Sequence, residues 1–88
     1  MYRIALSEPA DEDIKRWKKS GQRIIMNRIS KLLADIQAHP TTGIGKPEAL
    51  RYDLTGKYSR RINNEHRIIY TIDEEEEVVT ILSLYGHY

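Results

Sequence analysis

The chain has 88 residues, of which 40% are hydrophobic and 31% charged, with a formal net charge of +1 at pH 7. This length suits a modest core, so residues 1–88 are expected to form one domain without a membrane span or secretory signal. The absence of cysteine excludes a thiolate metal site and a disulfide framework, and it is typical of a cytoplasmic protein. The histidines do not have the spacing of metal ligands, so no metal or other cofactor is expected.

The first half of the chain predicts a strand followed by a helical hairpin. Residues 2–6 alternate as a strand with one buried face does. Ser7 suits a helix N-cap, and acidic residues follow it, so a helix is expected to run from there to about Lys19. A second helix is expected over residues 22–38, ending before Pro40. Its apolar residues recur at helical spacing: Ile25, Ile29, Leu32, Leu33 and Ile36.

The second half predicts strands joined by short turns. After a loop over residues 41–47, the expected strands are 49–54, 57–62, 66–72 and 78–85. The last of these is apolar on both sides, so we expect it to be central, between the first strand and strand 66–72. The order β-α-α-β-β-β-β indicates an α+β fold. It comprises an N-terminal strand, a two-helix hairpin and a four-stranded, mainly antiparallel sheet.

Positive charge is concentrated near the expected hairpin. Residues 46–67 hold six Lys and Arg against three acids, whereas residues 73–77 are all acidic. A basic cluster is usually a solvated surface, but it also suits a polyanion. A three-residue hairpin loop places Arg61 opposite Arg67, on the other face from Tyr58, Ile62, Ile68 and Tyr70. Opposed guanidiniums favour a phosphate between them, although each could instead pair with Glu48 or Glu65.

The remaining candidates are groups for acid–base chemistry and RNA contact. Glu48 follows a glycine-rich loop and is a candidate general base, although a surface glutamate at a turn is the commoner case. His87 is the natural candidate for a general acid, because imidazole ordinarily titrates near neutral pH. Lys46 and Arg51 could bind phosphates, and Tyr88 could stack on a base or orient His87. This combination suggests metal-free RNA cleavage.

The chain resembles the RelE superfamily of bacterial toxins, specifically its YoeB/Txe branch. The resemblance rests on Gly-Lys-Pro-Glu-Ala-Leu at residues 45–50, Tyr-Ser-Arg-Arg-Ile at 58–62, Glu-His-Arg-Ile-Ile-Tyr at 65–70 and the final His87-Tyr88. It covers essentially the whole chain, including the first strand and the helical hairpin. The motifs are specific in combination, although each alone is weak.

The resemblance implies a toxin that inhibits translation as a ribosome-dependent endoribonuclease, or mRNA interferase. Such enzymes use the 2′-hydroxyl of the RNA as nucleophile and leave a 2′,3′-cyclic phosphate and a 5′-hydroxyl. By position, Glu48 matches the general base, Arg67 the stabiliser of the transition state and His87 the general acid. Arg61 would support the phosphate, and Tyr88 would lie close to the site.

Three positions depart from the pattern of that branch. Arg51 stands where lysine is usual, which keeps the charge but changes the hydrogen-bond geometry. Tyr58 stands where tryptophan is common. Gly86 replaces a larger residue and could loosen His87, which bears on the efficiency of cleavage more than on its identity.

The resemblance also implies partners. A cognate antitoxin of the YefM/Axe type would wrap the toxin with a flexible segment and block or remodel its site. The other partners would be the ribosome and mRNA, and no membrane is expected. The resemblance leaves open whether the chain forms a homodimer or a toxin–antitoxin hetero-oligomer.

Two other functions remain open at this point. One is a catalytically weak or inactive relative that only binds ribosome, RNA or antitoxin. The presence of Glu48, Arg61, Arg67 and His87 together argues against it. The other is a related toxin that acts on DNA gyrase, a branch that would not be expected to carry this set of residues.

Overall fold

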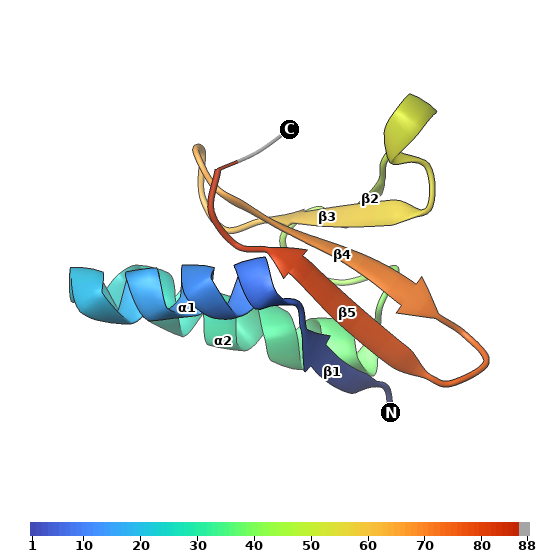
Figure 1. Ribbon diagram of the computed structural model, residues 1–88, viewed down its shortest axis with the longest axis horizontal. Coiled ribbons are helices and arrows are strands. Elements are labelled where there is room, and N and C mark those ends of the chain that lie inside the picture. The colour runs from blue at the N-terminus through green and yellow to red at the C-terminus, as the bar shows by residue number, and fades with distance from the viewer. Residues whose placement is uncertain (87–88) are drawn as a thin grey trace.

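The computed structural model describes residues 1–86, so His87 and Tyr88 lie outside the described residues. In chain order the elements are β1 (Arg3–Leu6), α1 (Glu8–Ser20), α2 (Arg23–Ala38), β2 (Glu48–Ala49), the 3₁₀ helix η1 (Tyr52–Leu54), β3 (Lys57–Arg61), β4 (Arg67–Asp73) and β5 (Val78–Ser83). Both helices cover one face of a five-stranded sheet (Figure 1). The predicted α+β fold is confirmed.

The sheet has the strand order β1-β5-β4-β3-β2. Neighbouring strands are antiparallel except for β1 and β5, which run parallel. The last strand therefore pairs with the first strand and with β4, as predicted. The strand that is buried on both faces, however, is β4, where Ile68, Ile69 and Tyr70 are at most 1% exposed. In β5 only Val79 and Ile81 are fully buried, because β5 lies one strand nearer the edge of the sheet.

The helical hairpin forms for local reasons that the sequence contains. Ser7 has an extended backbone, and its Oγ accepts a hydrogen bond from the N–H of Ala10 at 3.2 Å, which caps α1. Gly21 ends α1 with a φ of 69°, a left-handed conformation that glycine adopts without strain. Among residues 1–86, neither helix is long and apolar enough to cross a membrane.

The core lies between the helices and the sheet. Trp17 of α1 and Leu32 of α2 pack with residues from the middle of β4 and β5. The fully buried members of this cluster are Ala10, Trp17, Ile29, Leu32, Ile36, Ile62, Ile68, Tyr70, Val79, Ile81 and Leu84. The predicted core face of the hairpin is therefore correct for Ile62, Ile68 and Tyr70, with Tyr58 partly buried beside them.

The predicted strand over residues 49–54 is wrong. β2 has only two residues, and the chain then turns through η1. Tyr52 has a φ of 60°, and its carbonyl oxygen accepts hydrogen bonds from the N–H and the hydroxyl of Thr55, at 3.1 and 2.6 Å. These local bonds close a tight turn and prevent the segment from continuing the sheet.

The last strand is also shorter than predicted, ending at Ser83 and not at Tyr85. The cause is α1, which binds both backbone groups of the next residue. The N–H of Leu84 donates to Asp13 Oδ2 at 2.9 Å, and its carbonyl oxygen accepts from Trp17 Nε1 at 2.8 Å. Helix α1 thus takes the groups that would have extended the strand.

A buried arginine fixes the loop between α2 and β2. Arg60 is fully buried, and its guanidinium binds the carboxylate of Asp35 and the carbonyl oxygens of residues 39, 42 and 44. Its Nε also donates to the hydroxyl of Tyr70 at 3.2 Å. Arg60 therefore does not belong to an anion-binding surface, although it is one of the six basic residues counted between residues 46 and 67.

The same loop needs its two glycines. A Cβ on Gly43 would lie 1.9 Å from Asp35 Oδ2, and one on Gly45 would lie 2.6 Å from a methyl carbon of Leu32. Gly45 also accepts a hydrogen bond from the N–H of Arg61 at 2.7 Å. The loop is thus drawn tightly against α2 and β3, and it fixes where the following residues enter the sheet.

Candidate functional site

The candidate residues of the sheet lie on the face turned away from the helices. Arg61 is the register partner of Arg67, as predicted, and Glu48 is the partner of Ser59. Directly opposed residues share a face, and so do residues two apart on one strand. Glu48, Arg61 and Arg67 therefore project from the same face. This face is called the open face because the helices do not cover it, although Ser59 and Ile69 on it are buried. The helices cover the other face, where Tyr70 packs in the core.

The register also sets the spacing of these groups. Opposed Cβ atoms in an antiparallel pair are about 5 Å apart, so the two arginine side chains start side by side. Glu48 lies one strand over and about 7 Å along β3 from Arg61, since residues two apart on a strand are separated by that rise. The side chains of Glu48 and Arg61 are exposed and that of Arg67 is half-buried. A carboxylate thus lies within reach of the same ligand as two guanidiniums.

Within residues 1–86, neither arginine forms an ion pair with an acidic side chain. The ion pairs among residues 1–86 join Lys15 to Asp11 and Arg60 to Asp35, and Nε2 of His66 lies 3.9 Å from a carboxylate oxygen of Glu65. Pairing of Arg61 or Arg67 with Glu48 or Glu65, the alternative that the sequence left open, is absent from this part of the chain. The opposed guanidiniums remain available to an anion.

We expect Arg61→Ala to leave the melting temperature unchanged or slightly raised. The side chain is exposed, it makes no ion pair within residues 1–86, and its removal relieves repulsion from Arg67. The change in the free energy of unfolding should stay within about 0.5 kcal/mol. Thermal denaturation followed by circular dichroism measures this. A loss of several degrees would show that Arg61 is a structural ion-pair partner.

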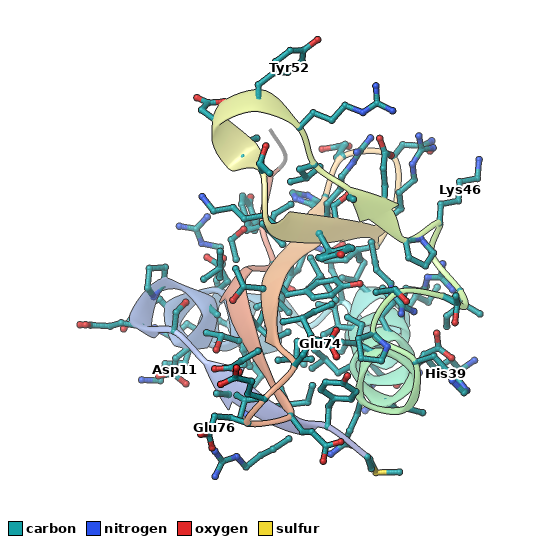
Figure 2. The ribbon with its side chains drawn as sticks, turned by 90° about the vertical axis from the view of Figure 1, so that its right-hand side faces the viewer. Asp11, His39, Lys46, Tyr52, Glu74 and Glu76 are labelled. Atoms are coloured by element: carbon teal, nitrogen blue, oxygen red, sulfur yellow. The ribbon has the colours of Figure 1, made fainter. Side chains whose placement is uncertain are left out.

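Lys46 and Arg51 lie on either side of Glu48 in the chain, and both are exposed. Lys46 follows Gly45. The carbonyl oxygen of Gly45 accepts a hydrogen bond from the N–H of Arg61, which places Gly45 at the edge of the sheet. Figure 2 shows Lys46 pointing away from the protein into solvent. Arg51 directly precedes η1, which stands out from the sheet on the side away from the helices (Figure 1). Both cations are therefore placed around the open face and not within it.

The chain returns to the start of β4 at the end of the described residues. The carbonyl oxygen of Gly86 accepts a hydrogen bond from the N–H of Arg67 at 2.9 Å. The predicted general acid His87 and the aromatic Tyr88 fall outside the described residues, so their roles stay predictions. The φ of 77° at Gly86 gives a backbone reason for glycine at this position.

A second group of basic residues, which was not predicted from the sequence, lies on the helices. Residues 15–31 contain seven Lys and Arg and no acid, a count that the sequence alone would have revealed. They lie on α1 and α2, on the helical side of the molecule. These cations, all exposed except the half-buried Arg28, are Lys15, Arg16, Lys18, Lys19, Arg23, Arg28 and Lys31. The exposure of Tyr52 was also not predicted, and this residue is 90% exposed.

Comparison with solved structures defines the class of protein. The fold matches the structure described as a YoeB/ParE toxin from Agrobacterium tumefaciens, with a TM-score of 0.91, 27% identity and coverage of 98% of this chain and 99% of that one. It also matches the toxin chain of a heterotetrameric YoeB-YefM toxin-antitoxin complex from Staphylococcus aureus. There the TM-score is 0.85 and the identity 40%, over 100% and 99% of the two chains. The fold is that of bacterial toxins of the YoeB type.

The family follows from the sequence comparisons. The family model described as "YoeB-like toxin of bacterial type II toxin-antitoxin system" matches residues 6–88. Toxin YoeB of Mycobacterium bovis is 40% identical over 88 residues, which are the whole of both chains. The chain belongs to the YoeB-like toxin family, and it is the toxin of a type II toxin–antitoxin system. The resemblance seen in its motifs is confirmed.

Proposed function

We propose that this toxin is a ribosome-dependent endoribonuclease that cleaves mRNA by metal-free acid–base chemistry and so inhibits translation. The observation that carries the proposal is the placement of Glu48, Arg61 and Arg67 on one open face of the sheet. A base beside two opposed cations suits a phosphodiester that is attacked from its own sugar. Membership of the YoeB-like family supports the same reading.

In the proposed reaction, the Glu48 carboxylate removes the proton from the 2′-hydroxyl of the nucleotide to be cleaved. The 2′-oxygen then attacks the adjacent phosphorus, and negative charge grows on the non-bridging oxygens. Arg67, supported by Arg61, stabilises this charge with hydrogen bonds that guanidinium forms well with phosphate. The bond from phosphorus to the 5′-oxygen breaks, and His87 gives that oxygen a proton. The products are a 2′,3′-cyclic phosphate and a 5′-hydroxyl.

The ribosome would supply what the chain lacks. Cleavage through the 2′-hydroxyl requires the attacking oxygen, phosphorus and leaving oxygen to lie in line, and holding that geometry contributes much of the rate. A 10.3 kDa chain whose base and one arginine are exposed on an open face offers few groups to hold an RNA strand. Lys46 and Arg51 would contact flanking phosphates, and the basic residues 15–31 would add long-range attraction to ribosomal RNA.

We propose that the partner that binds this toxin when it is not cleaving mRNA is a cognate antitoxin of the YefM type. The Staphylococcus aureus complex joins a YoeB toxin, 40% identical to this chain, to a YefM antitoxin. A segment with acidic and apolar residues that orders on binding would complement the cations around the open face. We place the system in the cytoplasm, where mRNA is translated.

The ribosome requirement gives a direct test. We expect specific cleavage of mRNA on purified ribosomes and little cleavage of the same mRNA when ribosomes are omitted. Ribosome binding should weaken as salt rises, because Lys and Arg contacts to phosphates release counterions. The two assays use primer extension and sedimentation across a salt series. Efficient, sequence-selective cutting of naked mRNA at low protein concentration would contradict the proposal.

A further inference from the structure

The last described residue, Gly86, is held on both sides by two consecutive residues of another segment. Its N–H donates to Nδ1 of His66 at 2.9 Å, and its carbonyl oxygen accepts from the N–H of Arg67 at 2.9 Å. We call this pair of hydrogen bonds the Gly86 clamp. It lies beyond β5, which ends at Ser83, and its bond to Arg67 is a backbone bond to the first residue of β4.

The imidazole of His66 is seated so that Nδ1 faces Gly86. Its ring meets the Trp17 ring edge-on, with centroids 4.8 Å apart and planes at 87°, and it contacts the Tyr85 ring at 4.5 Å. The side chain is 13% exposed. Its other nitrogen, Nε2, lies 3.9 Å from a carboxylate oxygen of Glu65, and the residue is one of those that line a cavity of about 360 Å³. The ring is fixed from two sides by aromatic contact.

This geometry specifies the chemical form of the ring. A nitrogen that accepts a hydrogen bond cannot carry a proton, so Nδ1 is bare and the proton of a neutral imidazole is on Nε2. His66 therefore acts in this structure as a neutral acceptor.

The clamp lies at the edge of the core, because the His66 ring packs against Trp17, a member of the buried cluster. Leu84 is already fixed to α1 by bonds to Asp13 and Trp17. Gly86 comes two residues later, and its φ of 77° gives it a conformation that most residues avoid. The clamp thus adds order at the one described residue that directly precedes His87.

We propose that His66 is a positioning residue for RNA cleavage, which acts by fixing the Gly86 peptide from which His87 and Tyr88 extend. This inference rests on the proposed function, because it assigns His66 a task only if His87 donates a proton. Arg67 connects the cationic site to the Gly86 clamp. Its side chain is on the face with Glu48, and its backbone N–H holds Gly86. One dipeptide, His66-Arg67, would therefore set the distance between the cationic site and the start of the terminal pair.

Two substitutions of similar size separate the hydrogen bond from the packing. Asn places its Oδ1 near the position of Nδ1 and keeps an acceptor for Gly86, whereas Leu fills space without one. We expect His66→Leu to lower kcat for mRNA cleavage on ribosomes about 10- to 100-fold, the cost of a small misplacement of a reacting group. The ribosome concentration at half-maximal rate should not change. His66→Asn should retain most of the rate. Both variants should keep an ordered fold, as a cooperative melting transition would show.

A second measurement follows the clamp itself by NMR. In the wild type, we expect slow hydrogen exchange at the Gly86 amide and a ¹⁵N shift at His66 that shows Nδ1 without a proton. Exchange at Gly86 should become fast in His66→Leu and stay slow in His66→Asn. The amide of Leu84, which bonds to Asp13, serves as an internal reference that should be protected in all three proteins.

Several results would overturn the proposal. Two of them are measured on the wild-type protein and so do not depend on the folding of a variant: a proton on Nδ1 of His66, or a Gly86 amide that exchanges freely. Another is equal loss of rate in His66→Leu and His66→Asn, or no loss in His66→Leu. A wild-type protein that does not cleave mRNA would instead refute the proposed function. The slow exchange at Gly86 would then identify a purely structural bond, and the positioning role would fall.

Discussion

Glu48→Ala and His87→Ala should each lower the rate of ribosome-dependent mRNA cleavage about 10²- to 10⁴-fold, the usual contribution of a positioned acid or base. Glu48 is exposed and outside the core, so Glu48→Ala should leave the melting temperature near that of the wild type. Single-turnover cleavage with saturating ribosomes measures the chemical step without the binding step. Glu48→Gln, which keeps the shape but not the basicity, should be as slow as Glu48→Ala.

Glu76→Ala is the matched control for these two substitutions. Glu76→Ala removes an exposed acid from the turn at the far end of the molecule, as Figure 2 shows by the separation of Glu76 from Lys46. It should cleave at the wild-type rate. Near-normal cleavage by both Glu48→Ala and His87→Ala would refute the acid–base mechanism. A comparable loss in Glu76→Ala would show that the assay reports net charge and not catalysis.

Arg60→Ala should lower the free energy of unfolding by about 3–5 kcal/mol, the range for breaking a buried ion pair by removing one partner. Its guanidinium is fully buried and binds the Asp35 carboxylate together with carbonyl oxygens of the loop after α2. The substitution leaves these acceptors without a partner. Urea denaturation followed by circular dichroism measures the loss. The adjacent Arg61→Ala, on the opposite face of the same strand, is the control that should cost almost nothing.

The same cluster gives a pH dependence with a defined sign. The hydrogen bond from Arg60, aided by the N–H of Ile44 and by the charge of Arg60, holds the pKa of the Asp35 carboxyl below its ordinary value. Its stabilisation is therefore complete above the unfolded-state pKa and is lost as pH falls through the lower folded pKa. Asp35→Asn should be less stable near neutral pH and lose less stability on acidification. A stability equal to that of the wild type for both Arg60→Ala and Asp35→Asn would show that the cluster contributes nothing.

The sequence predicted the parts of this structure that depend on local rules. Ser7 caps the start of α1 and Gly21 ends it. The short loop after Arg61 sets the register of Arg61 with Arg67. That register brings two of the candidate residues together. Glu48 joins them because it begins the short strand β2 and pairs with Ser59.

The remaining features depend on contacts that a sequence pattern does not contain. Strand alternation places Arg60 on the core side, yet its acceptors come from Asp35 and a loop far along the chain. The segment after β2 contains residues compatible with a strand, but the hydrogen bonds of Thr55 to Tyr52 favour a turn. The bond from Gly86 to His66 likewise joins residues that no periodicity relates.

The chemistry at the ends of the cleaved RNA tests the central claim most directly. mRNA cut on the ribosome by the wild-type protein should carry a 2′,3′-cyclic phosphate upstream and a 5′-hydroxyl downstream. The same mRNA with a single 2′-deoxynucleotide at the cleavage position should resist cutting, because it lacks the nucleophile that Glu48 is proposed to activate. Cleavage of the deoxy-substituted mRNA at the normal rate, or products with a 3′-hydroxyl and a 5′-phosphate, would contradict the account.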